Sequence, residues 1–276
     1  MSSEIRLIAV DMDGTLLDAD HVTVPPRNIA ALRAASERGA ALAIANGRTW
    51  SLIADAVEQL GLMDYAIVGN GAAVRDVKNH RGIYENSIPW GQAAEIIRLL
   101  HRERLPFEVY CSGQNYVERG DLELVRPHCL SPEFTRLFEE KTIFPDSLEA
   151  ELTGRAVEKF NIFHVPADRL SPVLEAASAT GPVAVANSFA QNLEIAAGGA
   201  NKGTALKALA AHLGLGAEQV MAFGDAGNDL EMLSWAGWSF AMANGTGEAK
   251  SAARYEAPAN TDAGVGQMVE RYVLDC

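Results

Sequence analysis

The stretch that decides the fold is Ala9–Asp18, AVDMDGTLLD, close to the start of the chain. The apolar run Ile5–Val10 predicts a buried strand, and this strand ends directly in two carboxylates, Asp11 and Asp13. Burial of a carboxylate costs desolvation free energy, and two carboxylates one residue apart repel each other unless a cation lies between them. The stretch therefore indicates functional residues at the end of a buried strand.

Composition limits the classes of function that this chain can have. It has 276 residues, 48% of them hydrophobic, which is enough for one large domain or two modest ones with a proper core. The formal net charge of -13 argues against a nucleic acid or an anionic membrane as partner, because phosphate-rich surfaces attract lysine and arginine. A small phosphorylated ligand stays compatible with this charge, since it needs only one or two local cations.

Cysteine usage and the N-terminal residues indicate a cytoplasmic protein. The chain has three cysteines, Cys111, Cys129 and Cys276, without a CxxC spacing, which is typical of reduced thiols. The first ten residues, MSSEIRLIAV, lack a basic region before a short apolar segment, and that segment cannot span a bilayer. We therefore expect no targeting segment.

Short apolar runs alternate with helical patterns in the first and last thirds of the chain. The predicted strands are Ile5–Val10, Ala41–Ala45, Ala66–Val68, Val220–Phe223 and Phe240–Ala243. The predicted helices are Arg27–Arg38, Leu52–Leu60, Lys202–Leu213 and Leu230–Ala236. This alternation predicts an α/β fold with a doubly wound parallel sheet, built from both ends of the chain.

The middle of the chain has a different pattern, with strands that follow one another more closely. The predicted strands are Ile83–Asn86, Phe107–Cys111, Tyr116–Glu118, Lys159–Val165 and Val183–Ala186, and the predicted helices are Ala93–Arg104 and Ser171–Ala179. Residues 129–152 give no clear element. We expect an α+β domain with antiparallel strands, inserted at 82–188 into a core domain formed by 1–81 and 189–276.

Polar residues follow four of the strands predicted for the core domain. They are Asp11 and Asp13, Asn46 to Arg48, Asn70 with Gly71, and Asp225 with Asn228 and Asp229. Ligands of parallel sheets bind at the carboxyl ends of the strands, and these acids meet there if the first strand lies beside Val220–Phe223. A shared Mg²⁺ would relieve their mutual repulsion. Each Asp could instead be a helix cap or turn residue, but the combination of DxD and GDxxND favours a metal site.

The residue types suggest a different chemical role for each of these charged residues. Asp11, at the strand end, can attack phosphorus and form an aspartyl-phosphate, while Asp13 can protonate the leaving oxygen and then deprotonate water. Lys202 opens a helix, where a cation is unfavourable without a nearby anion, so we expect it beside the phosphoryl oxygens and Asp11.

The turn after the second predicted strand offers further hydrogen-bond donors for the phosphate oxygens. The amide of Asn46 can donate to a phosphate oxygen with help from backbone N–H groups around Gly47, although Asn46 could also be a plain turn residue. Arg48 could hold an anionic group or cap a neighbouring acid.

Four segments together resemble a known family. They are DMDGTLLD (11–18), NGR (46–48), NKG (201–203) and GDAGNDLEML (224–233). In this order, with a large insert between the second and third, they are similar to the haloacid dehalogenase (HAD) superfamily, and within it to Cof-type hydrolases with a type IIB cap. The resemblance implies a Rossmann-like HAD core, an inserted cap domain that sets specificity, and a Mg²⁺-dependent phosphohydrolase that works through an aspartyl-phosphate.

The resemblance also implies roles for individual residues. The implied catalytic residues are Asp11, Asp13, Asn46 and Lys202. The implied phosphate- or substrate-binding residues are Asp11, Met12, Gly47, Arg48, Asn70, Gly71, Lys202 and Asn228. The implied metal ligands are Asp11, Asp13 through its backbone carbonyl, Asp225 and Asp229. One departure is Asn46, where the family usually has Thr or Ser; its longer planar amide places the hydrogen bond to phosphate differently and bears on turnover rather than on fold.

These observations predict a phosphatase for small phosphorylated metabolites, such as sugar phosphates or similar phosphomonoesters, present as a monomer or homodimer. Two alternatives stay open at this point: phosphoryl transfer of the phosphomannomutase kind, and a non-catalytic protein that binds a phosphorylated metabolite. Polar residues of the insert have no motif that assigns them a role; among them are Glu108, Tyr110, Arg119, Arg126, His128 and His164.

Overall fold

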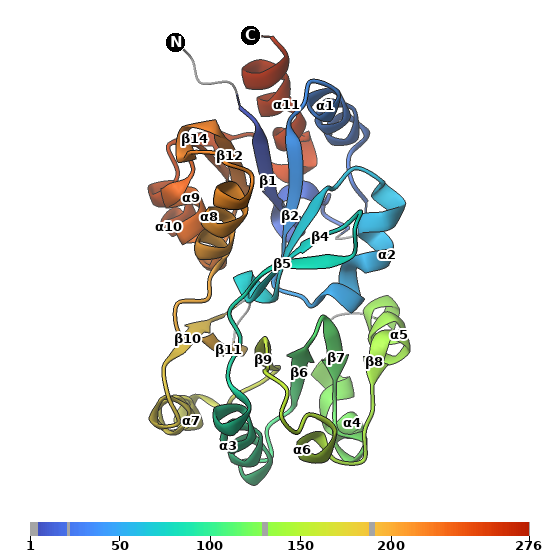
Figure 1. Cartoon of the computed structure of the whole chain (residues 1–276), viewed down its shortest axis with the longest axis vertical. Helices are drawn as coiled ribbons and strands as arrows, with labels where there is room; N and C mark the ends of the chain where they lie inside the picture. The colour runs from blue at the N-terminus through green and yellow to red at the C-terminus, as the bar shows by residue number, and fades with distance from the viewer. Residues whose placement is uncertain (1–4, 21–22, 129–131, 188–190, 276) are drawn as a thin grey trace. The chain divides into compact units, whose positions relative to one another are not determined.

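The computed structural model describes residues 5–20, 23–128, 132–187 and 191–275 (Figure 1). The chain forms two compact units. The core unit comprises Met1–Gly47, Ala56–Tyr84 and Asn201–Cys276, and the cap unit comprises Arg48–Asp55 and Glu85–Ala200. Within the described ranges, no helix combines the length and apolar character that a bilayer crossing needs.

The core sheet has eight strands in the order β14-β13-β12-β1-β2-β3-β4-β5. The strands are β1 Leu7–Asp11, β2 Ala41–Ala45, β3 Tyr65–Val68, β4 Ala73–Asp76, β5 Arg81–Glu85, β12 Val220–Gly224, β13 Trp238–Met242 and β14 Tyr255–Ala257. The strands from β14 to β3 are parallel, and β4 runs antiparallel to β3. The predicted parallel α/β sheet is confirmed, and so is the neighbourhood of β1 and β12, on which the meeting of the acids depends.

Helices of the core unit cover this sheet. They are α1 Pro26–Glu37, α2 Trp50–Leu60 (its first residues belong to the cap unit), α8 Lys202–His212, α9 Leu230–Trp235, α10 Gly247–Ala252 and α11 Gly264–Val269. Leu7 and Ala9 of β1 are fully buried in one cluster with Leu206 of α8 and Met232 of α9. Because side chains alternate along a strand, one side of β1 packs on these helices and the strand direction fixes where Asp11 emerges.

The cap unit has a sheet of six strands in the order β10-β11-β9-β6-β7-β8. The strands are β6 Phe107–Cys111, β7 Gln114–Tyr116, β8 Thr142–Ile143, β9 Lys159–Ile162, β10 Val183–Ala186 and β11 Leu193–Ala197. The helices are α3 Trp90–Arg102, α4 Leu122–Val125, α5 Pro132–Lys141, α6 Leu148–Glu151 and α7 Ala167–Ala179. All pairs are antiparallel except β7 with β8, which are parallel.

The chain divides into its compact units after Tyr84 and after Ala200. The domain limits expected from the sequence, at 82 and 188, stay a prediction. The division after Ala200 arises because β11, which was not predicted, pairs with β9 and β10 in the cap sheet. Residues 48–55 group with the cap unit, where Ser51 N donates to Gly113 O at 2.9 Å. In the segment without a clear prediction, the described part forms α5, β8 and α6, while 129–131 lie outside the described residues.

The turn after β3 packs against the start of α8. Gly71 has φ +91°, and a Cβ atom built there would lie 2.1 Å from the carbonyl oxygen of Asn201. Asn201 caps α8, because its Oδ1 accepts a hydrogen bond from Thr204 N at 2.8 Å. The absence of a side chain at Gly71 therefore allows the approach that sets the position of Lys202, the first residue of α8.

We expect Gly71→Ala to destabilise the protein far more than Gly39→Ala. Gly39 has nearly the same φ, +93°, but no atom lies within 4 Å of a Cβ atom built there. Gly39→Ala should therefore cost only the conformational strain, about 1 kcal/mol, whereas Gly71→Ala should add roughly 1–3 kcal/mol because the backbone of α8 must move. Chemical denaturation of the two variants measures this difference; equal losses would show that the close approach to α8 has no energetic consequence.

Candidate active site

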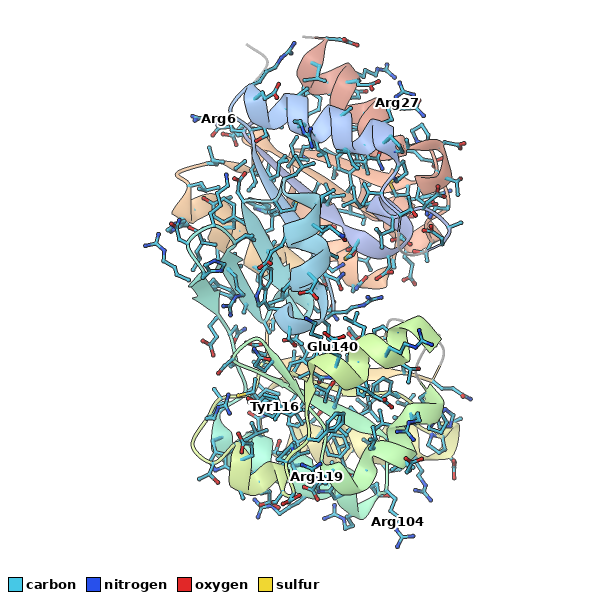
Figure 2. All side chains as sticks on the ribbon, turned by 90° about the vertical axis from the view of Figure 1, so that its right-hand side faces the viewer. Arg6, Arg27, Arg104, Tyr116, Arg119 and Glu140 are labelled. Carbon is cyan, nitrogen blue, oxygen red and sulfur yellow. The ribbon has the colours of Figure 1, made fainter. Side chains whose placement is uncertain are left out.

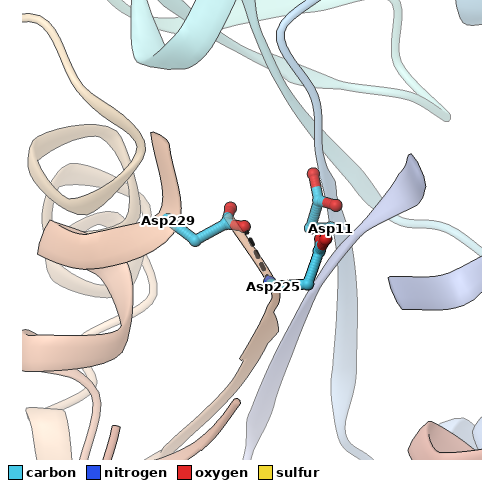
Figure 3. Close-up of side chains that lie close together, drawn as sticks. All are labelled: Asp11, Asp225 and Asp229. Atoms are coloured by element: carbon cyan, nitrogen blue, oxygen red, sulfur yellow. Dashed lines mark hydrogen bonds between the residues drawn. The ribbon is translucent and has the colours of Figure 1, made fainter. Parts of the chain in front are cut away.

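Three carboxylates converge at the carboxyl ends of β1 and β12 (Figure 3). The register pairs Val10 with Phe223, so Asp11, the last residue of β1, and Asp225, just after β12, emerge side by side. Asp229 comes from the helical turn Gly227–Asp229 that follows. One carboxylate oxygen from each of the three residues lies within 4.8 Å of those of the other two.

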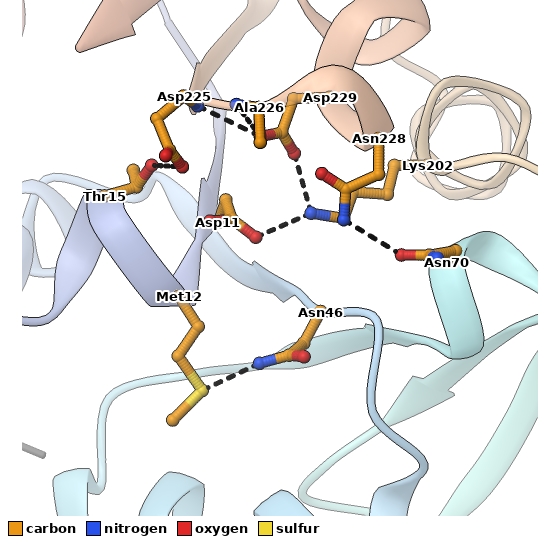
Figure 4. Close-up of polar contacts among 10 residues, drawn as sticks. All are labelled: Asp11, Met12, Thr15, Asn46, Asn70, Lys202, Asp225, Ala226, Asn228 and Asp229. Carbon is orange, nitrogen blue, oxygen red and sulfur yellow. Dashed lines mark hydrogen bonds and ion pairs between the residues drawn. The ribbon is translucent and has the colours of Figure 1, made fainter. Parts of the chain in front are cut away.

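A buried ammonium group lies between two of these carboxylates (Figure 4). Nζ of Lys202 is 2.6 Å from Asp11 Oδ1 and 2.6 Å from Asp229 Oδ1, and the lysine side chain is 0% exposed. A cation in the first turn of a helix is unfavourable, because the helix dipole is positive there. The two carboxylates offset this cost and fix the ammonium group beside Asp11, as the sequence predicted.

Both carboxylate oxygens of Asp229 accept hydrogen bonds from neighbouring groups. Its Oδ1 accepts from Lys202, and its Oδ2 accepts from the backbone N–H groups of Asp225 at 3.0 Å and Ala226 at 3.1 Å. Gly224 is needed beside it, since a Cβ atom at Gly224 would lie 2.5 Å from that of Asp229. Asp229 thus orients both the ammonium group and the turn that carries Asp225.

The loop after β1 approaches Asp225 closely. Thr15 Oγ1 donates to Asp225 Oδ1 at 3.0 Å. Gly14 has φ +77°, a conformation that favours glycine, and a Cβ atom there would lie 2.5 Å from Asp225 Oδ2, so a side chain at this position would force the Asp225 carboxylate to move. Asp13 precedes it in the helical turn Met12–Leu16, with a non-helical backbone at φ -77° and ψ 125°.

Burial and charge repulsion act on the protonation of the carboxylates. Burial raises the pKa of Asp11 well above its usual value; Lys202 opposes this rise, and the negative charges of Asp229 and Asp225 add to it. Burial, followed by the charge of Asp229, raises the pKa of Asp225 to about 6. Burial alone would lower the pKa of Lys202, but the two carboxylates raise it, so the lysine stays charged.

The donor set at this edge fits a hard divalent cation. Three carboxylates share one ammonium group, so the cluster is short of positive charge. Burial first, and the negative charges of the neighbouring carboxylates second, raise the pKa values of Asp11 and Asp225, and a bound cation would oppose both effects. Carboxylate oxygens are the ligands that Mg²⁺ prefers in proteins.

Three carboxamides lie at the ends of β2, β3 and β12 (Figure 4). Asn46 Nδ2 donates to Sδ of Met12 at 2.9 Å, which ties the end of β2 to the residue after Asp11. Asn70 N donates to Asn46 O at 3.2 Å, and Asn228 Nδ2 donates to Asn70 Oδ1 at 3.2 Å. A Cβ atom at Gly47 would lie 2.9 Å from Asn70 Oδ1. The structure therefore brings Met12, Asn46, Gly47, Asn70 and Asn228 together as neighbours.

Arg48 differs from this group. It belongs to the cap unit, where its guanidinium carbon lies 5.1 Å from the centre of the Phe134 ring. This is a favourable cation–π contact. The expected contact of Arg48 with phosphate stays a prediction.

Three polar residues near the site were not predicted as site residues. Thr15 holds Asp225, and Asn244 Nδ2 donates to Gly14 O at 2.8 Å. Asn260 Nδ2 donates to Leu17 O at 2.8 Å, and its backbone N–H donates to Asn244 Oδ1 at 3.1 Å. The available signal was the position of Thr15 directly after the DxDG turn, whereas no local pattern links residue 244 or 260 to residue 14.

Comparisons with known proteins identify the family. The family model for haloacid dehalogenase-like hydrolases matches residues 8–269. A 5-amino-6-(5-phospho-D-ribitylamino)uracil phosphatase, YcsE of Bacillus subtilis (strain 168), is 29% identical over 271 residues, which cover 98% of this chain and 97% of the relative. An HMP-PP phosphatase of Yersinia pseudotuberculosis serotype I (strain IP32953) is 32% identical over 239 residues, covering 87% and 84%.

A solved structure supports the fold. The HAD subclass IIB sugar phosphatase BT4131 superimposes with a TM-score of 0.81 at 23% identity, over 97% of this chain and 98% of the other. The chain therefore belongs to the haloacid dehalogenase-like hydrolases, and it is an enzyme of this family, a Cof-type phosphohydrolase with a type IIB cap.

Proposed function

We propose that this protein is a Mg²⁺-dependent phosphatase that hydrolyses small phosphomonoesters through an aspartyl-phosphate at Asp11. The observation that carries the proposal is the placement of Asp11 beside Asp225 at the ends of adjacent strands, with Lys202 Nζ 2.6 Å from Asp11 Oδ1. Both relatives are named phosphatases, which supports the same class of reaction.

In the first step, an oxygen of Asp11 attacks phosphorus. A bond forms between phosphorus and Asp11 while the ester bond to the leaving oxygen breaks, and the carboxylic acid of Asp13 gives its proton to that oxygen. Lys202 holds the attacking carboxylate in place and offsets the negative charge of the phosphoryl oxygens. Asn46 and the backbone N–H groups near Gly47 donate hydrogen bonds to these oxygens.

In the second step, water removes the phosphoryl group from Asp11. Asp13, now a carboxylate, accepts a proton from the water molecule, whose oxygen attacks phosphorus as the bond to Asp11 breaks. Asp11, Asp225 and the Asp13 carbonyl would hold Mg²⁺, with Asp229 behind them, and the ion supplies positive charge for the oxygens of the transferred group.

The substrate belongs to the small phosphorylated metabolites, with sugar phosphates or similar phosphomonoesters as the first candidates. We assign phosphate contacts to Met12, Gly47, Arg48, Asn70, Gly71 and Asn228 as part of the same proposal. The net charge of -13 agrees with a small ligand rather than a nucleic acid or an anionic membrane. A cytoplasmic location and a monomeric or homodimeric state complete the proposal.

We expect Asp11→Asn to lower kcat for p-nitrophenyl phosphate by about 10³-fold or more, because the amide cannot act as nucleophile. Asp18→Asn is the matched control: it is the same substitution in the same segment, at a carboxylate that accepts from its neighbour Ala19 N. It should leave kcat within about twofold of the unsubstituted protein. Phosphate release in the presence of Mg²⁺ measures both, and undiminished turnover by Asp11→Asn would refute the assignment.

We expect removal of divalent cations by EDTA to abolish phosphate release, and added Mg²⁺ to restore it. Asp225→Asn should weaken Mg²⁺ binding about tenfold or more, as measured by calorimetry without substrate. Asp262→Asn, at an exposed carboxylate of the core unit, is the control and should bind Mg²⁺ like the unsubstituted protein. Equal affinities in the two variants would place the ion elsewhere.

A further inference from the structure

Strand β14 is the last strand of the core sheet (Figure 1), and β13 is its one neighbour among the strands that the structure describes. Ala243 N, just after β13, donates to Ala257 O at 2.9 Å, so Ala257 bonds toward β13. Because bonding residues alternate along a parallel pair of strands, the backbone N–H and C=O groups of Glu256 point away from β13. They face the unpaired edge of the sheet, where another strand can add.

Two exposed residues of opposite charge lie at this edge. Arg254 directly precedes β14, and Glu256 is the second residue of the strand, so strand alternation places both positions on one face. Among the residues that the structure describes, none forms an ion pair with Arg254. Glu256 Oε2 lies 3.8 Å from Lys250 Nζ, which is too far for a hydrogen bond, and the glutamate side chain is 58% exposed. Both charges are therefore accessible to a partner.

The order Arg254, Tyr255, Glu256 is self-complementary when two copies of the strand pair antiparallel. A two-fold axis at Tyr255 places Arg254 of one copy opposite Glu256 of the second copy, and the reverse, so that two pairs of opposite charge form. Moving the axis by one residue in either direction places two arginines or two glutamates opposite each other, and like charges there are destabilising. The charges therefore favour one register of a pair formed by identical chains.

The backbone groups at the edge fit the same register. The outward N–H of Glu256 in each copy meets the C=O of Arg254 in the second copy, which gives two hydrogen bonds related by the axis. The N–H of Arg254 is not needed for this pair, because it donates to Ser239 Oγ at 3.0 Å within its own chain. Pro258, which has no N–H to donate, lies beyond the paired residues.

The other face of β14 carries an aromatic cluster that reaches the surface. The centre of the Tyr255 ring lies 5.2 Å from that of Phe240 and 6.0 Å from those of Trp238 and Tyr272. Tyr255 is nevertheless 42% exposed. In the register described, the two copies of Tyr255 form a pair without mutual backbone hydrogen bonds, in which opposite side chains come closest. Their contact would bury aromatic surface, as the centres of protein interfaces commonly do.

We propose that β14 is the contact between two copies of this chain, which pair antiparallel about Tyr255 and join their core sheets in a homodimer. A short, charged edge strand ordinarily prevents pairing between copies, because the charges meet like charges or water. Here the charges of the second copy are of opposite sign, so the same short edge selects one partner and one register. The inference narrows the expected monomeric or homodimeric state, and it does not depend on the proposed phosphatase activity.

Sedimentation velocity of the full chain, at concentrations from about 1 to about 100 µM, tests the proposal, since contacts of modest area associate in this range. We expect the unsubstituted protein to form a dimer. Arg254→Glu places two glutamates opposite each other, and Glu256→Arg places two arginines opposite each other. Each single variant should therefore raise the dissociation constant of the dimer about tenfold or more. The double variant Arg254→Glu/Glu256→Arg exchanges the charges and should restore the dimer.

A mixture of the two single variants tests the two-fold register itself. Arg254→Glu carries two glutamates and Glu256→Arg carries two arginines, so an equimolar mixture should form a heterodimer although each variant alone is a monomer. Arg6→Glu is the matched control, because Arg6 is also an exposed arginine of the core unit but precedes β1 (Figure 2). It should dimerise like the unsubstituted protein. Circular dichroism checks that each variant is folded, and if one single variant is not, the other and the double variant still decide.

Three results would overturn the inference. The first is an unsubstituted protein that stays monomeric at the highest concentration. The second is a dimer that both single variants leave intact, which would place the contact elsewhere on the chain. The third is dissociation by the single variants that neither the double variant nor the mixture reverses, which would exclude the antiparallel register about Tyr255. None of these measurements uses phosphate release, so they decide the contact whether or not the proposed function holds.

Discussion

The contact between the ammonium group of Lys202 and the carboxylates of Asp11 and Asp229 is the interaction on which the rest of the site depends. All three side chains are buried, and none of them would be stable as an isolated charge in the core unit. The contact joins the end of β1, the start of α8 and the turn after β12, which are far apart in the chain. The same contact leaves the cluster with more carboxylates than cations, and this imbalance makes the edge of the sheet suitable for a divalent cation and a phosphoryl group.

The surrounding backbone is shaped so that this contact can form. Gly14, Gly71 and Gly224 lie where a side chain would collide with Asp225, with the backbone of Asn201 and with Asp229. Thr15 and Asn244 then hold the loop after β1 in place.

The sequence predicted which charged side chains lie together, because the signals are local and physically costly, while the roles of these residues stay a prediction. Acids at the end of an apolar run and a lysine at a helix start both require a partner, and the parallel sheet supplied the geometry. Thr15 and Asn244 were not predicted, because their partners are distant in the chain and their residue types are common in turns. Strand β11 was not predicted either, since Glu194 interrupts its apolar run. In the structure this glutamate is buried in the cap sheet, with its Oε1 3.2 Å from Lys159 Nζ of the neighbouring strand β9.

The most direct test of an aspartyl-phosphate at Asp11 is to stop the reaction with acid during turnover and to locate the phosphoryl group by mass spectrometry of the digested protein. We expect the added mass of one phosphoryl group on the peptide that contains Asp11, assigned by fragmentation to Asp11 rather than Asp13. A phosphoryl group on any other residue, or continued turnover with Asp11 unmodified at every quench time, would contradict it.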